Sequence, residues 1–234
     1  MKQLTKISLI AAALSSTLFV SQSALAEVSA NIGATTNYIW RGVSQSSDAA
    51  SVSGGIDYAA DSGFYAGTWV GSLGDSDSGF SGTETDLYLG FGGEVEGFTY
   101  DIGYIYYLYT ELDDSNFGEI YVNAGFGNFG VGVAYTVNSE LDKGAGFESG
   151  DIYYSLSYGG IALGNEFELA LSAGLYTFDS DGTFDSEGKK RDYNYSHVQA
   201  DISKGDFAFS IVKAQESAFA DEDLKFVASW STSF

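Results

Sequence analysis

The sequence ends in KFVASWSTSF (Lys225–Phe234), a segment whose side chains alternate between two kinds. Neighbouring residues of an extended strand point to opposite faces, so Phe226, Trp230 and Phe234 share one face and the small residues between them share the other. Such a strand must pair its edge and cover its apolar face, and a closed barrel in a lipid bilayer does both. The terminal segment therefore predicts an outer-membrane β-barrel.

The first 26 residues have the features of a secretory signal peptide. Lys2 and Lys6 give a positive start, residues 7–20 are mostly apolar, and Ala24-Leu25-Ala26 fits a cleavage site with small residues. We expect a signal peptide over 1–26, export to the bacterial outer membrane, and one barrel domain over 27–234.

The composition narrows the classes of partner. The 234 residues carry a formal net charge of −22, which makes nucleic acid and anionic surfaces implausible partners. There is no cysteine, so stability must come from burial or closure. The mean hydropathy of −0.02 suits barrel strands, because alternating faces average to neutral. A secreted, salt-adapted β-sandwich would also be acidic and glycine-rich, and it is the soluble alternative.

Period-2 patterning and turn residues predict twelve strands. Their predicted ranges are 28–42, 51–60, 63–73, 83–93, 97–109, 116–127, 129–137, 150–159, 166–178, 191–204, 207–214 and 225–234. The even-numbered connections are mostly short, such as Asp61-Ser62 and Gly205-Asp206, whereas odd-numbered ones, such as 74–82 and 179–190, are longer and polar. Short turns at one end and long loops at the other are typical of a closed antiparallel up-and-down transmembrane β-barrel, and an even count places both termini at the turn end.

Four segments carry a family resemblance. NYIWRGVSQS (37–46), GGIDY (54–58), YAGTW (65–69) and ETDLYLG (84–90) resemble the TorF-type porin family of proteobacteria. The resemblance implies an outer-membrane barrel that acts as a channel. One departure is Tyr109-Thr110-Glu111, where the family tends to place a proline.

Charged residues on the predicted polar faces are candidates for lining a pore, because charges that project into a bore set its selectivity. Most are carboxylates, which favours cations, and Arg41 opposite Glu84 and Asp86 would narrow the pore. The alternative is that these residues are solvated or paired and have no selective role. The candidates are Arg41, Asp57, Glu84, Asp86, Asp101, Glu119, Glu168 and Asp201.

Aromatic residues near the predicted strand ends suit a membrane interface, where amphipathic rings prefer the headgroup level. An alternative role for inward tyrosines is stacking on sugar rings. The girdle candidates are Tyr38, Trp40, Trp69, Trp230 and Phe234.

Signals for catalysis, cofactors and metals are weak. His197 is the lone histidine and the sequence has no Gly-x-Ser-x-Gly motif, so we expect that the protein is not an enzyme. The string 125–130 matches Gly-x-Gly-x-x-Gly, but an alternating strand follows it, so no cofactor is expected. The acidic loops, including 75–77 and 179–187, lack EF-hand spacing and predict at most weak divalent bridging to lipopolysaccharide.

The resulting prediction is a channel for passive diffusion of ions or small solutes that prefers cations. The bore of a twelve-stranded barrel is wider than that of a small barrel filled by side chains and narrower than that of an open porin. The alternative is a non-conducting structural, receptor or adhesin-like barrel that acts through its acidic loops. Expected partners are outer-membrane lipids, lipopolysaccharide and a small solute or ion; a homo-oligomer is an open alternative.

Overall fold

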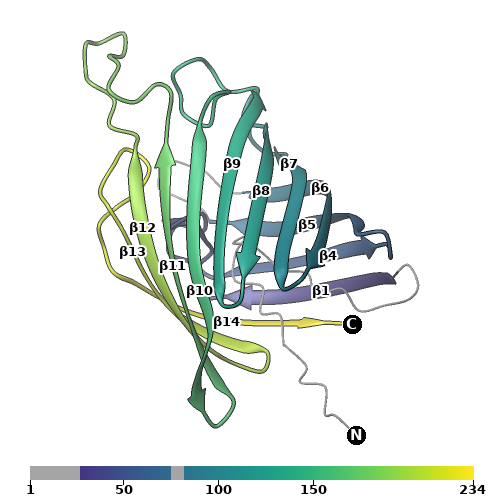
Figure 1. The fold of residues 1–234 in the computed structure, drawn as a ribbon. Helices are drawn as coiled ribbons and strands as arrows, with labels where there is room; N and C mark the ends of the chain where they lie inside the picture. The colour runs from purple at the N-terminus through teal and green to yellow at the C-terminus, as the bar shows by residue number, and fades with distance from the viewer. Residues whose placement is uncertain (1–26, 75–81) are drawn as a thin grey trace, which may run out of the picture.

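The computed structural model describes residues 27–74 and 82–234, and within these ranges twelve strands close into one antiparallel barrel (Figure 1). The predicted signal peptide and the acidic segment 75–77 lie outside the described residues. Among the described residues, no helix is long and apolar enough to span a membrane. The barrel strands are β1 (Glu27–Thr35), β4 (Ser51–Ala59), β5 (Phe64–Leu73), β6 (Gly82–Val95), β7 (Phe98–Tyr109), β8 (Phe117–Phe126), β9 (Phe129–Ser139), β10 (Ile152–Gly164), β11 (Phe167–Thr177), β12 (Tyr195–Lys204), β13 (Phe207–Ala214) and β14 (Lys225–Ser233).

The barrel closes where the first strand meets the last. β1 pairs with β4 along its whole length, from Glu27 opposite Ala59 to Thr35 opposite Ser51. Its other edge pairs with β14, with Thr35 opposite Ser229. Closure satisfies the hydrogen-bonding groups at both edges, as a bilayer requires. The predicted all-β closed barrel is confirmed, and so is the role of 225–234 as its last strand.

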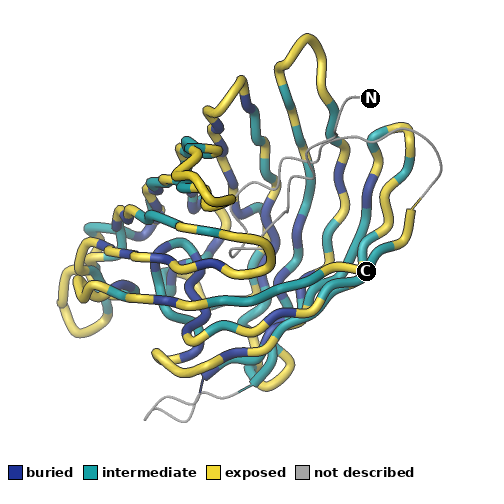
Figure 2. The backbone as a smooth tube through the Cα atoms, turned by 90° about the horizontal axis from the view of Figure 1, so that it is seen from below, coloured by how far each residue is buried: buried dark blue, intermediate teal, exposed yellow. Residues whose placement is uncertain are grey.

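Side chains alternate between the two faces of the wall, as the burial pattern in Figure 2 shows. In β14, Phe226 is 59% exposed on the outside while Val227 is 6% exposed on the inside. The exposed large side chains of the other strands are likewise mostly apolar, and they cover the exterior. This is the arrangement that a lipid-facing exterior needs.

The two ends of the barrel differ in their connections. One end carries tight turns such as Glu96-Gly97 and Gly205-Asp206, with positive φ at each of these residues except Asp206. We call it the turn end, and the other, with connections such as 178–194, the loop end. The predicted alternation of short and long connections is thus present, although the predicted connection 160–165 is shorter because β10 continues to Gly164.

Several inward glycines lie beneath tyrosine rings of the neighbouring strand. A Cβ atom on Gly90 would lie 2.3 Å from the hydroxyl oxygen of Tyr65, and one on Gly103 would lie 2.4 Å from that of Tyr121. Each glycine is also the direct cross-strand partner of its tyrosine. Glycine therefore gives each ring room to lie along the inner wall.

The predicted first strand, 28–42, is wrong beyond Thr35. Residues 36–50 leave the wall and form a short hairpin of β2 (Ile39–Trp40) and β3 (Val43–Ser44), with Ile39 opposite Ser44. The alternating series of Ala34 and Thr36 continues into Tyr38 and Trp40, which explains the error. We call residues 36–50 the inner hairpin.

A charge on the outer face should destabilise the barrel in lipid. Leu89 is exposed near the middle of β6, and we expect Leu89→Lys to lower the free energy of unfolding by about 2–4 kcal/mol. Ser172→Lys, on the inner face of β11, is the matched control and should change it little. Urea unfolding of the refolded barrel in vesicles measures both, and equal losses would contradict the assignment of the faces.

Candidate functional site: an inner hairpin across the barrel

The inner hairpin folds into the barrel at the loop end and is held by polar contacts at its base. The Ser46 hydroxyl accepts a hydrogen bond from the backbone N–H of Tyr38 at 2.8 Å and donates one to the carbonyl of Ala49 at 2.6 Å. Asn37 donates from its amide to Asp48 at 2.7 Å. These contacts within residues 36–50 fix the shape of the hairpin at its base.

The turn of the hairpin presses against the barrel wall. Arg41 and Gly42 connect β2 to β3, with φ of 49° and 86°. A Cβ atom on Gly42 would lie 2.5 Å from the Cβ of His197 in β12. Position 42 therefore needs glycine both for its backbone conformation and for the close approach.

Arg41 forms a buried ion pair with Glu119 of β8. Its Nη1 and Nη2 donate to the two carboxylate oxygens at 2.7 and 2.6 Å, a bidentate arrangement. The two side chains are 7% and 1% exposed. Tyr107 and Tyr176 also donate their hydroxyl groups to Glu119, each at 3.2 Å. The carboxylate is thus held by two strands of the wall as well as by the hairpin.

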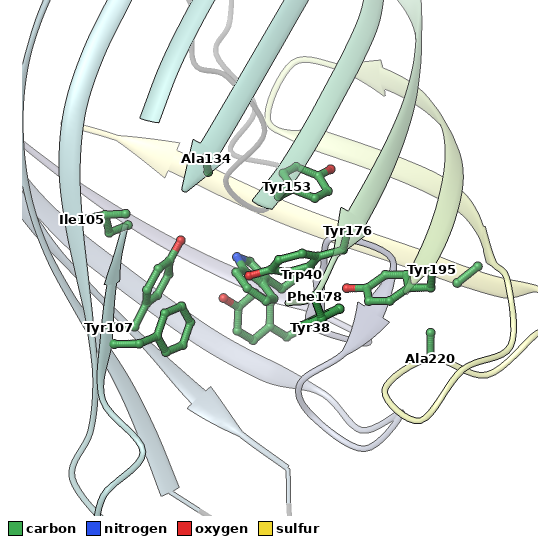
Figure 3. Close-up of a cluster of buried hydrophobic side chains, with 12 residues drawn as sticks. Tyr38, Trp40, Ile105, Tyr107, Ala134, Tyr153, Tyr176, Phe178, Tyr195 and Ala220 are labelled. Atoms are coloured by element: carbon green, nitrogen blue, oxygen red, sulfur yellow. The ribbon is translucent and has the colours of Figure 1, made fainter. Parts of the chain in front are cut away.

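Aromatic rings surround the guanidinium of Arg41 and the neighbouring indole of Trp40. Figure 3 shows the indole among the tyrosine rings. The Cζ of Arg41 lies 4.2 Å from the ring centre of Tyr153, 4.3 Å from that of Trp40 and 5.1 Å from that of Tyr176, all within cation–π range. Trp40 in turn packs edge-on against Tyr107 at 5.7 Å. We call this group the ionic-aromatic layer; it comprises Tyr38, Trp40, Arg41, Tyr107, Phe117, Glu119, Tyr153 and Tyr176.

The layer separates the two ends of the bore. Tyr107, Tyr176 and Glu119 are completely or almost completely buried, although they lie on the inner face of the wall. Inner-face residues nearer the turn end, such as Ser155 and Gln199, are half-buried instead. In this conformation the hairpin and the wall around it therefore exclude water at the level of the layer.

Two further carboxylates lie beside the layer on β6. Glu84 accepts a hydrogen bond from the Tyr38 hydroxyl at 2.7 Å. Asp86 is 0% exposed, and neither of its oxygens has a hydrogen-bond partner among the described residues. Because a buried charge without a partner is costly, Asp86 is the group here that most needs a cation or a proton.

Towards the turn end the inner wall is polar. Tyr65 donates to Asp101 at 2.6 Å and Tyr88 donates to Asp57. Ser210 donates to Asp201 at 2.5 Å, and the acids here are only half-buried. This half of the bore has the wetted carboxylates and hydroxyls that an aqueous vestibule needs.

Loops from the other side of the barrel cover the hairpin. Phe147 of the β9–β10 connection lies 5.9 Å from Trp40, and it also contacts Phe178 and Phe219 of two further loops. Asp151 joins two of these loops, since it accepts backbone N–H donors from Glu148 at 3.0 Å and Asp179 at 2.8 Å. Burial raises the pKa of the Asp151 carboxyl to about 6.

The structure distributes the predicted pore-lining residues over the bore. Glu84, Asp86 and Glu119 lie at the ionic-aromatic layer, whereas Asp57, Asp101 and Asp201 lie on the polar wall and Glu168 is exposed close to the turn end. Arg41 is in the bore, but on the hairpin turn and not on a strand, and its partner is Glu119 where Glu84 and Asp86 were expected. Their effect on ion flow stays a prediction.

Three predicted girdle residues lie inside the barrel, so the prediction is wrong for them. Tyr38 and Trp40 are buried in the layer, and Trp69 points inward, with its ring 5.3 Å from that of Tyr38. The bore and the membrane interface both suit amphipathic rings, and alternation does not distinguish them. Trp230 and Phe234 are on the outer face, where an interfacial role remains a prediction.

The sequence did not indicate that the wall residues around Arg41 form one group. Tyr153, Tyr176 and His197 come from three consecutive strands, and the hydroxyl of Tyr153 lies 2.8 Å from His197 Nε2. A usable signal was the inward parity of these residues at the same level of adjacent strands, because Tyr153 pairs with Tyr176 and Gly174 pairs with His197.

A protein-family model described as "Bacterial protein of unknown function (Gcw_chp)" matches residues 21–205. The chain belongs to the Gcw_chp family. No curated protein matches it significantly. The description of the family names no activity, so the likeness to TorF-type porins remains a prediction.

Solved structures with a similar fold are distant in sequence from this Gcw_chp protein. A structure from a study of in-meso crystallization of membrane proteins is 9% identical with a TM-score of 0.54, covering 88% of this chain and 83% of that one. The NanC porin is 10% identical with a TM-score of 0.47, covering 88% and 98%. OpdK from Pseudomonas aeruginosa is 13% identical with a TM-score of 0.39, covering 80% and 58%. The first supports the barrel fold alone; the two TM-scores below 0.5 carry no argument.

Substituting Gly42 should release the inner hairpin. We expect Gly42→Ala to cost at least about 1–2 kcal/mol of docking free energy, because φ is positive and the added Cβ meets His197. The natural chain has no cysteine, so Val43→Cys on the hairpin can report exposure through its rate of labelling by a water-soluble maleimide. Labelling should be faster in Gly42→Ala/Val43→Cys than in Val43→Cys alone; equal rates would mean that the close approach is not needed.

The loop arrangement around Asp151 should depend on pH. Its folded-state pKa of about 6 lies above the ordinary value of 3.8, so its contribution is complete below pH 3.8 and is lost as pH rises through 6. Amide protection at Glu148 and Asp179, corrected for intrinsic exchange, should therefore be higher at pH 5 than at pH 7.5. Asp151→Asn, which has no ionisable group there, should remove the difference, and an unchanged pH dependence in that variant would assign it elsewhere.

Proposed function

We propose that the protein is an outer-membrane channel for passive diffusion of ions or small solutes, and that its inner hairpin closes the bore in the conformation described. The turn end then faces the periplasm and the loop end faces outward. The observation that carries the proposal is that a loop insertion, and not the strands alone, completes the barrier across an otherwise polar bore. A loop attached to the wall mainly by side-chain contacts can move while the backbone ladder of the barrel stays intact.

The charge of the bore supports a preference for cations. Glu119 is neutralised by Arg41, but Glu84 and Asp86 lie beside it without a cationic partner in the described structure. Asp57, Asp101 and Asp201 add negative charge towards the periplasmic end. A bore with this excess of carboxylates attracts cations and repels anions.

One observation favours a second function. The ionic-aromatic layer is almost completely buried, which also suits a non-conducting barrel that acts as a structural element or as a receptor through its acidic loops. Neither reading involves an enzyme. The apolar exterior supports contact with membrane lipids, and binding of lipopolysaccharide by the acidic loops through divalent cations is part of the same proposal.

Single-channel recording with the hairpin removed separates these two functions. Replacing residues 38–46 by a Gly-Ser linker of equal length keeps the strands and takes away Trp40 and Arg41. We expect the conductance in planar bilayers to rise several-fold over that of the wild type. A variant that folds and inserts but stays silent would favour the structural or receptor function.

Asp86 should contribute to ion selectivity. In the hairpin-deleted channel, Asp86→Asn should lower the cation preference measured as the reversal potential across a salt gradient, because it removes a carboxylate from the wall of the bore. Asp114→Asn, the same charge change on an exposed loop residue, is the control and should have little effect. Anion preference in the parent channel would contradict the assigned selectivity.

A further inference from the structure

The wall around Arg41 has the composition of a receptor for a planar cation. Glu119, Tyr153 and Tyr176 belong to three different strands, whereas Arg41 and Trp40 come from the hairpin. We propose that these wall residues form a binding site for the guanidinium group of a small solute, and that Arg41 occupies this site when the hairpin is docked. Solute and hairpin then compete for one place. The inference deepens the proposed channel, since it names the class of solute that the bore recognises.

The geometry matches a guanidinium group better than other cations. Both oxygens of Glu119 accept from the two Nη atoms of Arg41, and the fork of the guanidinium fits this bidentate arrangement. The rings of Tyr153 and Tyr176 lie against the same group at 4.2 and 5.1 Å. A delocalised cation of low hydration gains from such rings, whereas a compact ammonium lacks the fork.

The site does not have the ligands that a metal ion would need. The described residues contain no group of three or more histidine, cysteine, aspartate or glutamate side chains placed to hold a metal. Asp86 lies close enough to interact with the charges of Glu84 and Glu119, so these carboxylates add negative potential around the site. Anions are therefore disfavoured and an organic cation is the class that remains.

Arg41 leaves one of its donors unused, which makes displacement feasible. Its Nε is buried and has no hydrogen-bond partner among the described residues. A buried unpaired donor reduces the net stability of the docked state. A free guanidinium solute is not tied to the hairpin backbone, so its orientation is set by the wall alone.

Competition has a measurable consequence for the hairpin. If a solute takes the place of Arg41, the tip of the hairpin loses its ion pair and its ring contacts, while residues 36–50 remain joined to β1 and β4. By linkage, the solute weakens docking of the hairpin by the same factor by which the docked hairpin weakens binding of the solute. The same residues therefore recognise the solute and hold the docked hairpin in place.

Methylguanidinium is the probe, at millimolar concentrations far below those that unfold proteins, and methylammonium is the control for charge alone. Titration calorimetry on the refolded mature barrel should show methylguanidinium binding roughly tenfold more tightly to Arg41→Ala than to the wild type. Arg41→Ala/Glu119→Gln should lose the gain, because the carboxylate is gone. The proposal would be overturned if Arg41→Ala and Arg41→Ala/Glu119→Gln bound methylguanidinium with equal affinity. It would also be overturned if Arg41→Ala bound methylammonium as tightly as methylguanidinium.

A second measurement avoids the loss of Arg41 in case that variant does not fold. In the Val43→Cys background, methylguanidinium should accelerate maleimide labelling of the hairpin in a saturable way, and methylammonium should not. No acceleration would overturn the proposal. Both readouts are independent of conductance, so specific binding to a silent barrel would refute the channel alone, and conduction without specific binding would refute this site alone.

Discussion

The ion pair between Arg41 and Glu119 is the interaction on which the interior of the barrel depends. Each of its two charges would be costly alone in this buried position, and the bidentate contact with two added phenol donors offsets that cost. The pair also fixes the level at which the hairpin enters, and with it the stacking of Trp40 and the cover provided by Phe147. Removing one partner leaves the other charge buried without a partner.

This dependence separates the barrel into two parts with different sources of stability. The wall is held by a continuous ladder that returns from β14 to β1, and apolar side chains cover its exterior. The inner hairpin contributes four residues to a sheet of its own and is held to the wall mainly by side chains. Two backbone hydrogen bonds add to these contacts, from Thr36 N–H to the Ala228 carbonyl at 2.9 Å and from Gly74 N–H to the Gln45 carbonyl at 3.2 Å. Motion of the hairpin therefore costs side-chain contacts, two backbone hydrogen bonds and two ion pairs, Arg41 with Glu119 and Asp48 with Lys225. Opening the wall would instead leave the backbone groups of whole strand edges unpaired.

Most of the wall could be predicted from the sequence, because a barrel strand in lipid repeats every two residues and its turns need particular residues. Phe226 and Val227 show the repeat, and Glu96-Gly97 and Gly205-Asp206 show the turns. The inner hairpin could not be predicted in this way. Tyr38 and Trp40 continue the alternation of β1, and only the contacts with Tyr107, Glu119 and Tyr176 show that they belong in the bore. Such contacts join strands far apart in the chain, so no local pattern encodes them.

The glycines that lie beneath tyrosine rings have a consequence for how wide such a bore can be. Tyr65 and Tyr121 keep their rings along the wall because Gly90 and Gly103 have no side chain to lift them. The width of the passage is thus set by glycines that lie behind the side chains that line it. Two relatives with identical charged and aromatic residues could differ in calibre through a glycine-to-alanine change alone, and a comparison of lining residues would overlook the difference.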